Sequence, residues 1–144
     1  MTQISNLPAH KARNLIGQKK LSSTELVKSC IEQYEKHNLN INAIVAIDQK
    51  VVLEQAKKCD EKVSKGETLG LLHGLPVGIK DLQMVKNLRS TYGSLLFKNY
   101  ILTLNYSDSN FAFNSSTSAE SSCIAFTKVG TKCSYSTCQV FSLS

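Results

Sequence analysis

The chain has 144 residues and a mass of 15.9 kDa, which suffices for one domain and is too little for two of ordinary size. Hydrophobic residues make up 42% and charged residues 19%, a composition that excludes the fibrous and the wholly disordered classes of protein. The net charge of +6 and the pI near 9.1 are only mildly basic, so they do not indicate a dedicated nucleic-acid binder.

Two further features of the composition limit the location and the chemistry of the chain. No apolar run approaches about 18 residues, and the first turns of the chain lack a signal-peptide core, so we expect a cytoplasmic protein without a membrane span. The five cysteines are odd in number and include no C-x-x-C pair. Because no histidine lies near Cys123, Cys133 and Cys138, the sequence predicts no metal site, and it predicts no cofactor.

The first forty residues predict two helices. The first is short and opens at Asn6-Leu7-Pro8, with proline near its first turn. The second begins with a capping box at residues 22–25 (SSTE) and is expected to end at residues 37–40 (HNLN). The residues expected to face inward are Leu7, Ala12, Ile16, Leu26, Val27, Cys30, Ile31 and Tyr34.

A strand and a third helix are expected next. Residues 43–47 (AIVAI) form a short, apolar, β-branched run that is typical of a buried strand. Asp48 can cap the helix that follows, and Gly66 lies where a helix end often needs a left-handed residue. Helix, strand, helix and a further apolar run indicate an α/β layer structure. The third helix is expected to bury Val52, Ala56, Cys59 and Val63.

The chain changes character after residue 102. The charged residues from there on are Asp108, Glu120, Lys128 and Lys132, which sum to zero. This segment also holds eleven serines and lacks sustained helical or strand periodicity. We therefore expect a folded domain over residues 1–102 and an irregular, Ser-rich tail over residues 103–144 that is disordered or poorly packed.

The strongest functional signal lies in residues 71–82 (LLHGLPVGIKDL). Gly74 and Pro76 mark a turn into a strand that carries Val77 and Ile79 on one face, while Lys80 points to the other face. In a crowded interior a lysine is costly unless neutral, and a neutral lysine can act as a general base. The residues alone leave a second interpretation open, an edge-strand lysine that discourages aggregation.

Residues 74–81 (GLPVGIKD) resemble the amidase signature family, whose members carry such a block, ending in Lys-Asp, at the end of a core strand. The resemblance continues through residues 85–94 (VKNLRSTYGS) and back to residues 21–27 (LSSTELV), and covers about residues 7–102. It implies the N-terminal portion of the amidase signature fold, with helices packed on a mixed sheet.

The sequence departs from the family pattern at two positions. Asn87 stands where glycine is usual, a mild change because Asn tolerates left-handed backbone better than most residues. Arg89 stands where proline is usual, and we expect it to loosen the turn.

The resemblance implies hydrolysis of carboxamide C–N bonds, or transfer of amide nitrogen, by a Ser-Ser-Lys mechanism. Lys80 stands at the family's lysine position, where a neutral amine would take a proton from a bridging serine that activates the serine nucleophile. Backbone amides of a glycine-rich loop would stabilise the oxyanion. The substrate stays open among fatty amides, small aliphatic amides and charged tRNA.

The family's serine-bearing loop has no counterpart in the sequence. Ser115-Ser116 and Ser121-Ser122 lack neighbouring glycines, and the only glycine after Ser94 is Gly130. We therefore expect a truncated amidase that is inactive alone, with a tail that arises from a frameshift or a splice event. Because family members are several times longer, uncovered strand edges and apolar faces predict poor solubility or partial disorder.

Two other interpretations remain. The chain could be half of a split amidase, completed by a partner chain that carries the serine loop and binds a small-molecule amide. Alternatively, it could be a small basic module that binds anionic partners through Lys11, Arg13, Lys19 and Lys20.

Overall fold

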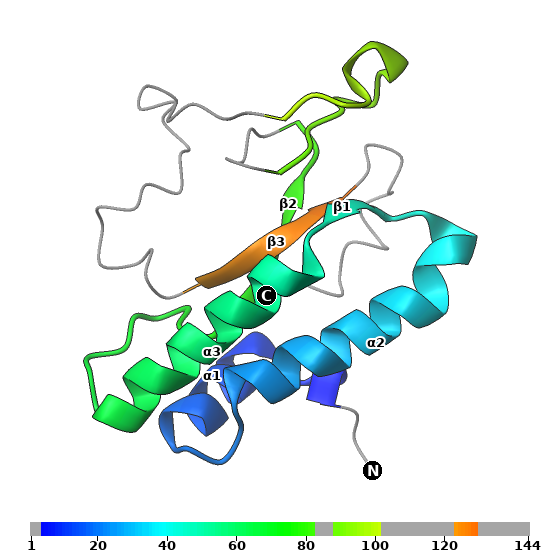
Figure 1. The fold of residues 1–144 in the computed structure, drawn as a ribbon. Coiled ribbons are helices and arrows are strands. Elements are labelled where there is room, and N and C mark those ends of the chain that lie inside the picture. The colour runs from blue at the N-terminus through cyan, green and yellow to red at the C-terminus, as the bar shows by residue number, and fades with distance from the viewer. Residues whose placement is uncertain (1–3, 83–87, 102–122, 130–144) are drawn as a thin grey trace.

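Figure 1 shows the fold as a computed structural model, which describes residues 4–82, 88–101 and 123–129. The described elements are the 3₁₀-helices η1 (Ile4–Asn6) and η2 (Leu95–Phe97), the helices α1 (Ala9–Gly17), α2 (Ser23–Ile41) and α3 (Gln49–Lys65), and the strands β1 (Ile44–Ile47), β2 (Leu75–Lys80) and β3 (Cys123–Val129). The combination of helices with a sheet confirms the predicted α/β class.

The three strands form one mixed sheet in the order β1-β3-β2. The central strand β3 is antiparallel to β1 and parallel to β2, with Leu75 opposite Cys123 and Lys80 opposite Val129. Helices α2 and α3 lie side by side against one face of this sheet (Figure 1). The mixed sheet with helices packed on it is the arrangement that the family resemblance implies.

Helix α2 begins as predicted and ends later than predicted. Ser22 Oγ accepts a hydrogen bond from the Glu25 backbone N–H at 3.0 Å, and the Glu25 carboxylate accepts one from the Ser22 N–H at 2.9 Å, which confirms the capping box. The helix continues to Ile41 because Asn42, with φ of 45°, supplies the left-handed residue that ends it. The Asn38 side-chain amide donates a hydrogen bond to the Ile44 carbonyl and accepts one from the Ile44 N–H, and these two bonds fix the turn into β1.

Helix α3 agrees with its prediction at both ends. Asp48 accepts a hydrogen bond from the Val51 N–H at 3.1 Å, and Gly66 adopts φ of 71° just past the last turn. Its Asp60 carboxylate accepts hydrogen bonds from the backbone of Ser23 at 2.7 Å and of Thr24 at 3.0 Å. A side chain of α3 therefore satisfies the free amides at the start of α2 and locks the two helices in register.

Helix α1 begins at Ala9, directly after Pro8, rather than at Asn6-Leu7-Pro8. The Arg13 guanidinium donates to the carbonyl oxygen of Gly70 at 2.9 Å and to that of Leu69 at 3.4 Å. Arg13 thus links α1 to the loop before β2. Of the four basic residues proposed to bind anionic partners, Arg13 therefore has a structural role.

The buried side chains form two clusters that match most of the predicted core. Of the residues expected to face inward from α2, Leu26 and Val27 are buried while Cys30, Ile31 and Tyr34 are half-buried. The first cluster contains Ala12, Ile16, Leu21, Leu26, Val63 and Leu75, and the second contains Val27, Val52, Ala56 and Cys59.

The strand β3 is the element that the sequence does not predict. Although the sequence shows no sustained strand periodicity after residue 102, Cys123–Val129 forms β3 and pairs with both other strands. Strand β3 lies between β1 and β2, which pair with β3 and not with each other. The pairing is made by backbone hydrogen bonds, which do not require an alternation of apolar and polar side chains. The serine pairs at 115–116 and 121–122 lie outside the described residues.

Candidate active site

The chain enters β2 through a close contact that requires glycine. Gly74 has φ of 76°, and a Cβ placed on it would lie 2.2 Å from Ser23 Oγ and 3.2 Å from Ser23 Cβ. No side chain fits at that distance, and the left-handed backbone independently favours glycine. The first residue of the GLPVGIKD block thus lets the loop pack directly on the start of α2.

The histidine that precedes this glycine is buried and neutral. His73 is 1% exposed, and its Nε2 lies 3.0 Å from the carbonyl oxygen of Cys59. Because a carbonyl only accepts, Nε2 carries the proton. Burial lowers the pKa of His73, aided by repulsion from Arg13 and Lys62, while the Cys59 carbonyl and Asp60 act in the opposite direction.

The two cysteines of the described helices are free thiols in apolar surroundings. Burial raises the pKa of Cys30 to about 11 and also raises the pKa of Cys59. Both thiols therefore stay protonated at neutral pH, as expected for cysteines that fill a core. Within the ranges that the structure describes, no group of three or more His, Cys, Asp or Glu side chains could hold a metal ion.

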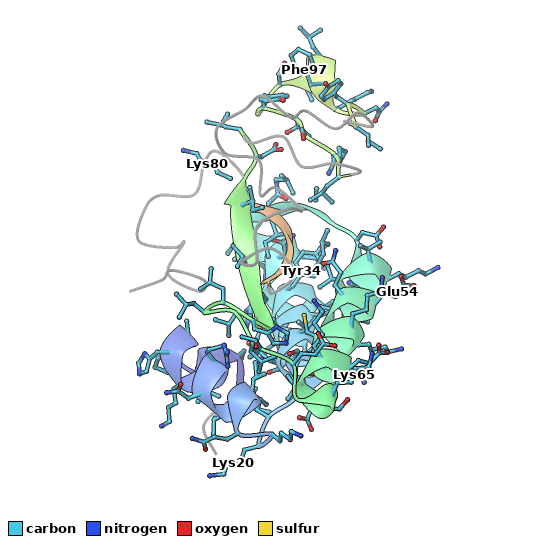
Figure 2. The ribbon with its side chains drawn as sticks, turned by 90° about the vertical axis from the view of Figure 1, so that its left-hand side faces the viewer. Lys20, Tyr34, Glu54, Lys65, Lys80 and Phe97 are labelled. Atoms are coloured by element: carbon cyan, nitrogen blue, oxygen red, sulfur yellow. The ribbon has the colours of Figure 1, made fainter. Side chains whose placement is uncertain are left out.

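Lys80 occupies the last position of β2, and its side chain is exposed. Figure 2 shows it pointing away from the helices, at the end of the molecule opposite Lys20. The expected crowded interior is therefore absent around Lys80 in the described residues, and this part of the prediction is wrong. The reason is positional, since the strand carries Lys80 past the layer that the helices cover.

Asp81, directly after Lys80, points inward and is 1% exposed. Its carboxylate accepts hydrogen bonds from the Thr91 backbone N–H, at 3.0 and 3.2 Å from its two oxygens, and from the Thr91 hydroxyl. The Lys-Asp pair thus splits into an exposed amine and a buried anchor. The sequence identifies the pair but not this division of roles.

The anchored segment folds into a tight turn over residues 91–94. Tyr92 and Gly93 both have left-handed backbone, with φ of 53° and 71°, and the Ser94 N–H donates to the Thr91 carbonyl at 2.9 Å. Ser94 Oγ then accepts from the Leu96 N–H at 3.3 Å and caps η2. The STYGS run therefore builds a turn that Asp81 holds beside the end of β2.

Arg89 strengthens this region rather than loosening it. Its guanidinium donates to the carbonyl oxygen of Val45 in β1 and to that of Lys98 at 3.3 Å. Its backbone also bridges to Ile101. The expectation of a looser turn is wrong because the long side chain reaches two carbonyls that proline could not bind, while Asn87 lies outside the described residues.

Comparisons of the sequence with known proteins agree with this geometry. A family model described as Amidase matches residues 25–109. The chain is 41% identical over 97 residues to the A subunit of glutamyl-tRNA(Gln) amidotransferase of Clostridium botulinum (strain Eklund 17B / Type B), covering 67% of this chain and 20% of that protein. It is 38% identical over 101 residues to the protein of the same name from Anaplasma phagocytophilum (strain HZ), covering 70% and 20%.

Solved structures give the same result for the fold. A bacterial aryl acylamidase of the amidase signature enzymes superposes with a TM-score of 0.63 at 26% identity, over 67% of this chain and 20% of that chain. A fatty acid amide hydrolase superposes with a TM-score of 0.59 at 26% identity, over 62% of this chain and 16% of that chain.

No helix in the described part of the chain is long and apolar enough to cross a membrane.

The segment that the family model matches, residues 25–109, carries the GLPVGIKD block and the turn that Asp81 anchors. The chain spans about a fifth of the length of the curated relatives it matches. By its sequence and by its fold, the chain belongs to the amidase signature family.

Proposed function

We propose that this chain supplies Lys80 as the general base for carboxamide C–N bond hydrolysis of the Ser-Ser-Lys type, and that it is inactive alone. The observation that carries the proposal is the split of the Lys-Asp pair at the end of β2. Asp81 fixes the strand end to the 91–94 turn, and this leaves the adjacent Lys80 amine free to face a second group of residues.

The chemistry needs an amine that can accept a proton. A neutral Lys80 would take a proton from a bridging serine, which would take one from the nucleophilic serine as its oxygen attacks the amide carbon. The C–N bond then breaks, the proton returns to the departing nitrogen, and water releases the acyl group from the serine. Only burial or nearby positive charge favours the neutral form of a lysine, so the exposed Lys80 requires polypeptide that covers it.

A partner chain is the arrangement that we favour for completing the site. The chain spans about a fifth of its relatives, and a polypeptide with the rest of the fold would bring both serines and the cover over Lys80. The relatives named above include a glutamyl-tRNA(Gln) amidotransferase, an aryl acylamidase and a fatty acid amide hydrolase. The names of these relatives all refer to amide chemistry, and we propose carboxamides as the substrate class. The expected cytoplasmic location stays a prediction.

The direct test is reconstitution. The chain is co-expressed with the part of the C. botulinum relative that follows the matched segment, and ammonia release from benzamide and acetamide is measured. We expect no hydrolysis by the chain alone, hydrolysis by the complex, and a loss of about 10²–10⁴-fold on Lys80→Met. Lys20→Met, which removes an exposed lysine at the other end of the molecule, is the matched control. Hydrolysis by the lone chain, or full activity of Lys80→Met, would refute the proposal.

A further inference from the structure

A buried histidine joins the loop that leads into β2 to helix α3. We call residues 66–74 the entry loop, since they run from the end of α3 to the start of β2. His73 lies in this loop, is 1% exposed, and donates from Nε2 to the carbonyl oxygen of Cys59 at 3.0 Å. The chemistry proposed for Lys80 does not use this titratable group.

The charges around the ring oppose the uptake of a proton. Arg13 of α1 and Lys62 of α3 repel a positive charge on the ring, and Asp60 of α3 attracts one. The Asp60 carboxylate already accepts hydrogen bonds from the start of α2, including one from the Thr24 hydroxyl at 2.6 Å. A protonated His73 would therefore be a buried cation near two others, and its counter-ion is already engaged, which makes the closed arrangement costly.

The entry loop is the part of this region that can open without unfolding of the helices. Leu71 is 91% exposed, and Leu69 and Leu72 are only half-buried. Arg13 holds the loop through the carbonyl oxygens of Leu69 and Gly70. Helices α2 and α3, by contrast, share both buried clusters. Segments with little buried apolar surface open at a lower free-energy cost than the whole chain.

Opening of the entry loop would uncover the Cys59 thiol. Cys59 is 5% exposed, and its sulfur accepts a hydrogen bond from the backbone N–H of Gly74, the last residue of the loop. The side chain of His73 bonds the carbonyl oxygen of the same cysteine. Two consecutive loop residues thus bind one residue of α3, so separation of the loop breaks both bonds and exposes the thiol.

We infer that His73 is a pH-sensitive switch that keeps the entry loop on α3 while its ring is neutral and releases the loop when the ring takes up a proton. The ring binds a proton more readily in the released loop, so release is favoured as the pH falls below 6.5 and suppressed above it. Because the entry loop runs directly into β2, acid loosens the start of the strand that ends at Lys80. The inference is independent of the proposed function, since it concerns groups of this chain alone.

The experiment measures the reactivity of Cys59 in the full chain. Methyl methanethiosulfonate is added between pH 5.5 and 7.5 (about the range in which histidine titrates), and mass spectrometry of peptides gives the initial rate of modification at Cys59. Each rate is divided by the rate in the urea-unfolded chain at the same pH, which removes the pH dependence of the thiol itself. His73→Gln removes the titrating ring and keeps a donor for the Cys59 carbonyl, while His37→Gln changes an exposed histidine and is the matched control.

We expect the normalised rate at Cys59 to rise about three- to tenfold from the highest to the lowest pH. The rise should be absent in His73→Gln and present in His37→Gln. Urea at concentrations below the unfolding transition should leave this rate nearly unchanged, because a local opening exposes little surface. Hydrogen exchange of the peptide with residues 66–75, which needs no variant, should show the same rise and the same insensitivity to urea.

Three results would overturn the inference. A Cys59 rate or a loop exchange rate that does not depend on pH would show that no proton controls the opening. A rise that survives in His73→Gln would assign the control to another group. A urea dependence as steep as that of global unfolding would show that the thiol is exposed only when the whole chain unfolds.

Discussion

The buried carboxylate of Asp81 and the side chain and backbone of Thr91 are joined across ten residues of sequence. Both the N–H and the hydroxyl of Thr91 donate to this carboxylate, which is 1% exposed. The link ties the end of β2 to the turn that carries η2 and thus sets the position of Lys80 relative to η2.

Removal of the Thr91 hydroxyl should destabilise the chain. Thr91→Val keeps the shape but leaves the Asp81 carboxylate with one donor fewer, which we expect to lower the free energy of unfolding by about 1–3 kcal/mol. Thr91→Ser keeps both donors and should cost less than half as much. Urea unfolding of the two variants measures the difference, and equal losses would show that the hydroxyl bond contributes nothing.

Substitution of Gly74 should be far more costly than substitution of Gly66. Both glycines have left-handed backbone, but a Cβ on Gly66 meets nothing within 4 Å, while one on Gly74 would lie 2.2 Å from Ser23 Oγ. We expect Gly66→Ala to cost about 1–2 kcal/mol from backbone strain alone. Gly74→Ala should add about 1–3 kcal/mol of overpacking.

A double variant separates these two contributions at Gly74. Gly74→Ala in a Ser23→Gly background removes the clash and keeps the backbone strain. Its cost should then approach that of Gly66→Ala in thermal unfolding. A cost that is independent of residue 23 would contradict the contact.

The buried His73 should make stability depend on pH. The unfolded chain takes up the proton at the ordinary pKa of 6.5, while burial lowers the pKa in the folded chain. The unfolded state therefore binds more protons as the pH falls below 6.5, so the free energy of unfolding is highest above that pH and decreases below it. Urea unfolding between pH 5 and 7.5 measures this slope (about the range in which histidine titrates).

Two variants identify the histidine responsible. His73→Gln, which can still donate to the Cys59 carbonyl, should flatten the slope. His37→Gln, which changes an exposed histidine, should keep it. A slope that survives His73→Gln would assign the pH dependence to another group.

Docking of the partner should protect Lys80 from chemical modification. In the lone chain Lys80 and Lys20 are both exposed, so acetic anhydride should acetylate them at similar rates. In the complex we expect Lys80 acetylation to slow at least tenfold while Lys20 is unchanged, measured by mass spectrometry of peptides. Equal rates in the complex would place the partner away from β2.

The features that sequence predicts correctly are encoded within a few neighbouring residues. The capping box of Ser22 and Glu25, the Asp48 cap and the left-handed Gly66 each depend on contacts that span four residues or fewer. The strand at 75–80 follows from its turn residues and its β-branched run.

The features that escaped prediction depend on distant partners. Asp81 gains its role from Thr91, and Arg89 gains its role from Val45, which lies 44 residues away. The strand β3 is held by the edges of β1 and β2 rather than by its own periodicity. Burial of Lys80 cannot be inferred from its strand because exposure depends on which polypeptide lies opposite.

The rate of benzamide hydrolysis by the reconstituted complex, compared between Lys80→Met and Lys20→Met, tests the role of Lys80 most directly. If the amine of Lys80 takes the proton from the bridging serine, the first variant loses about 10²–10⁴-fold in rate and the second retains the rate of the unchanged complex. Similar rates for the two variants, in complexes of equal yield, would contradict the account.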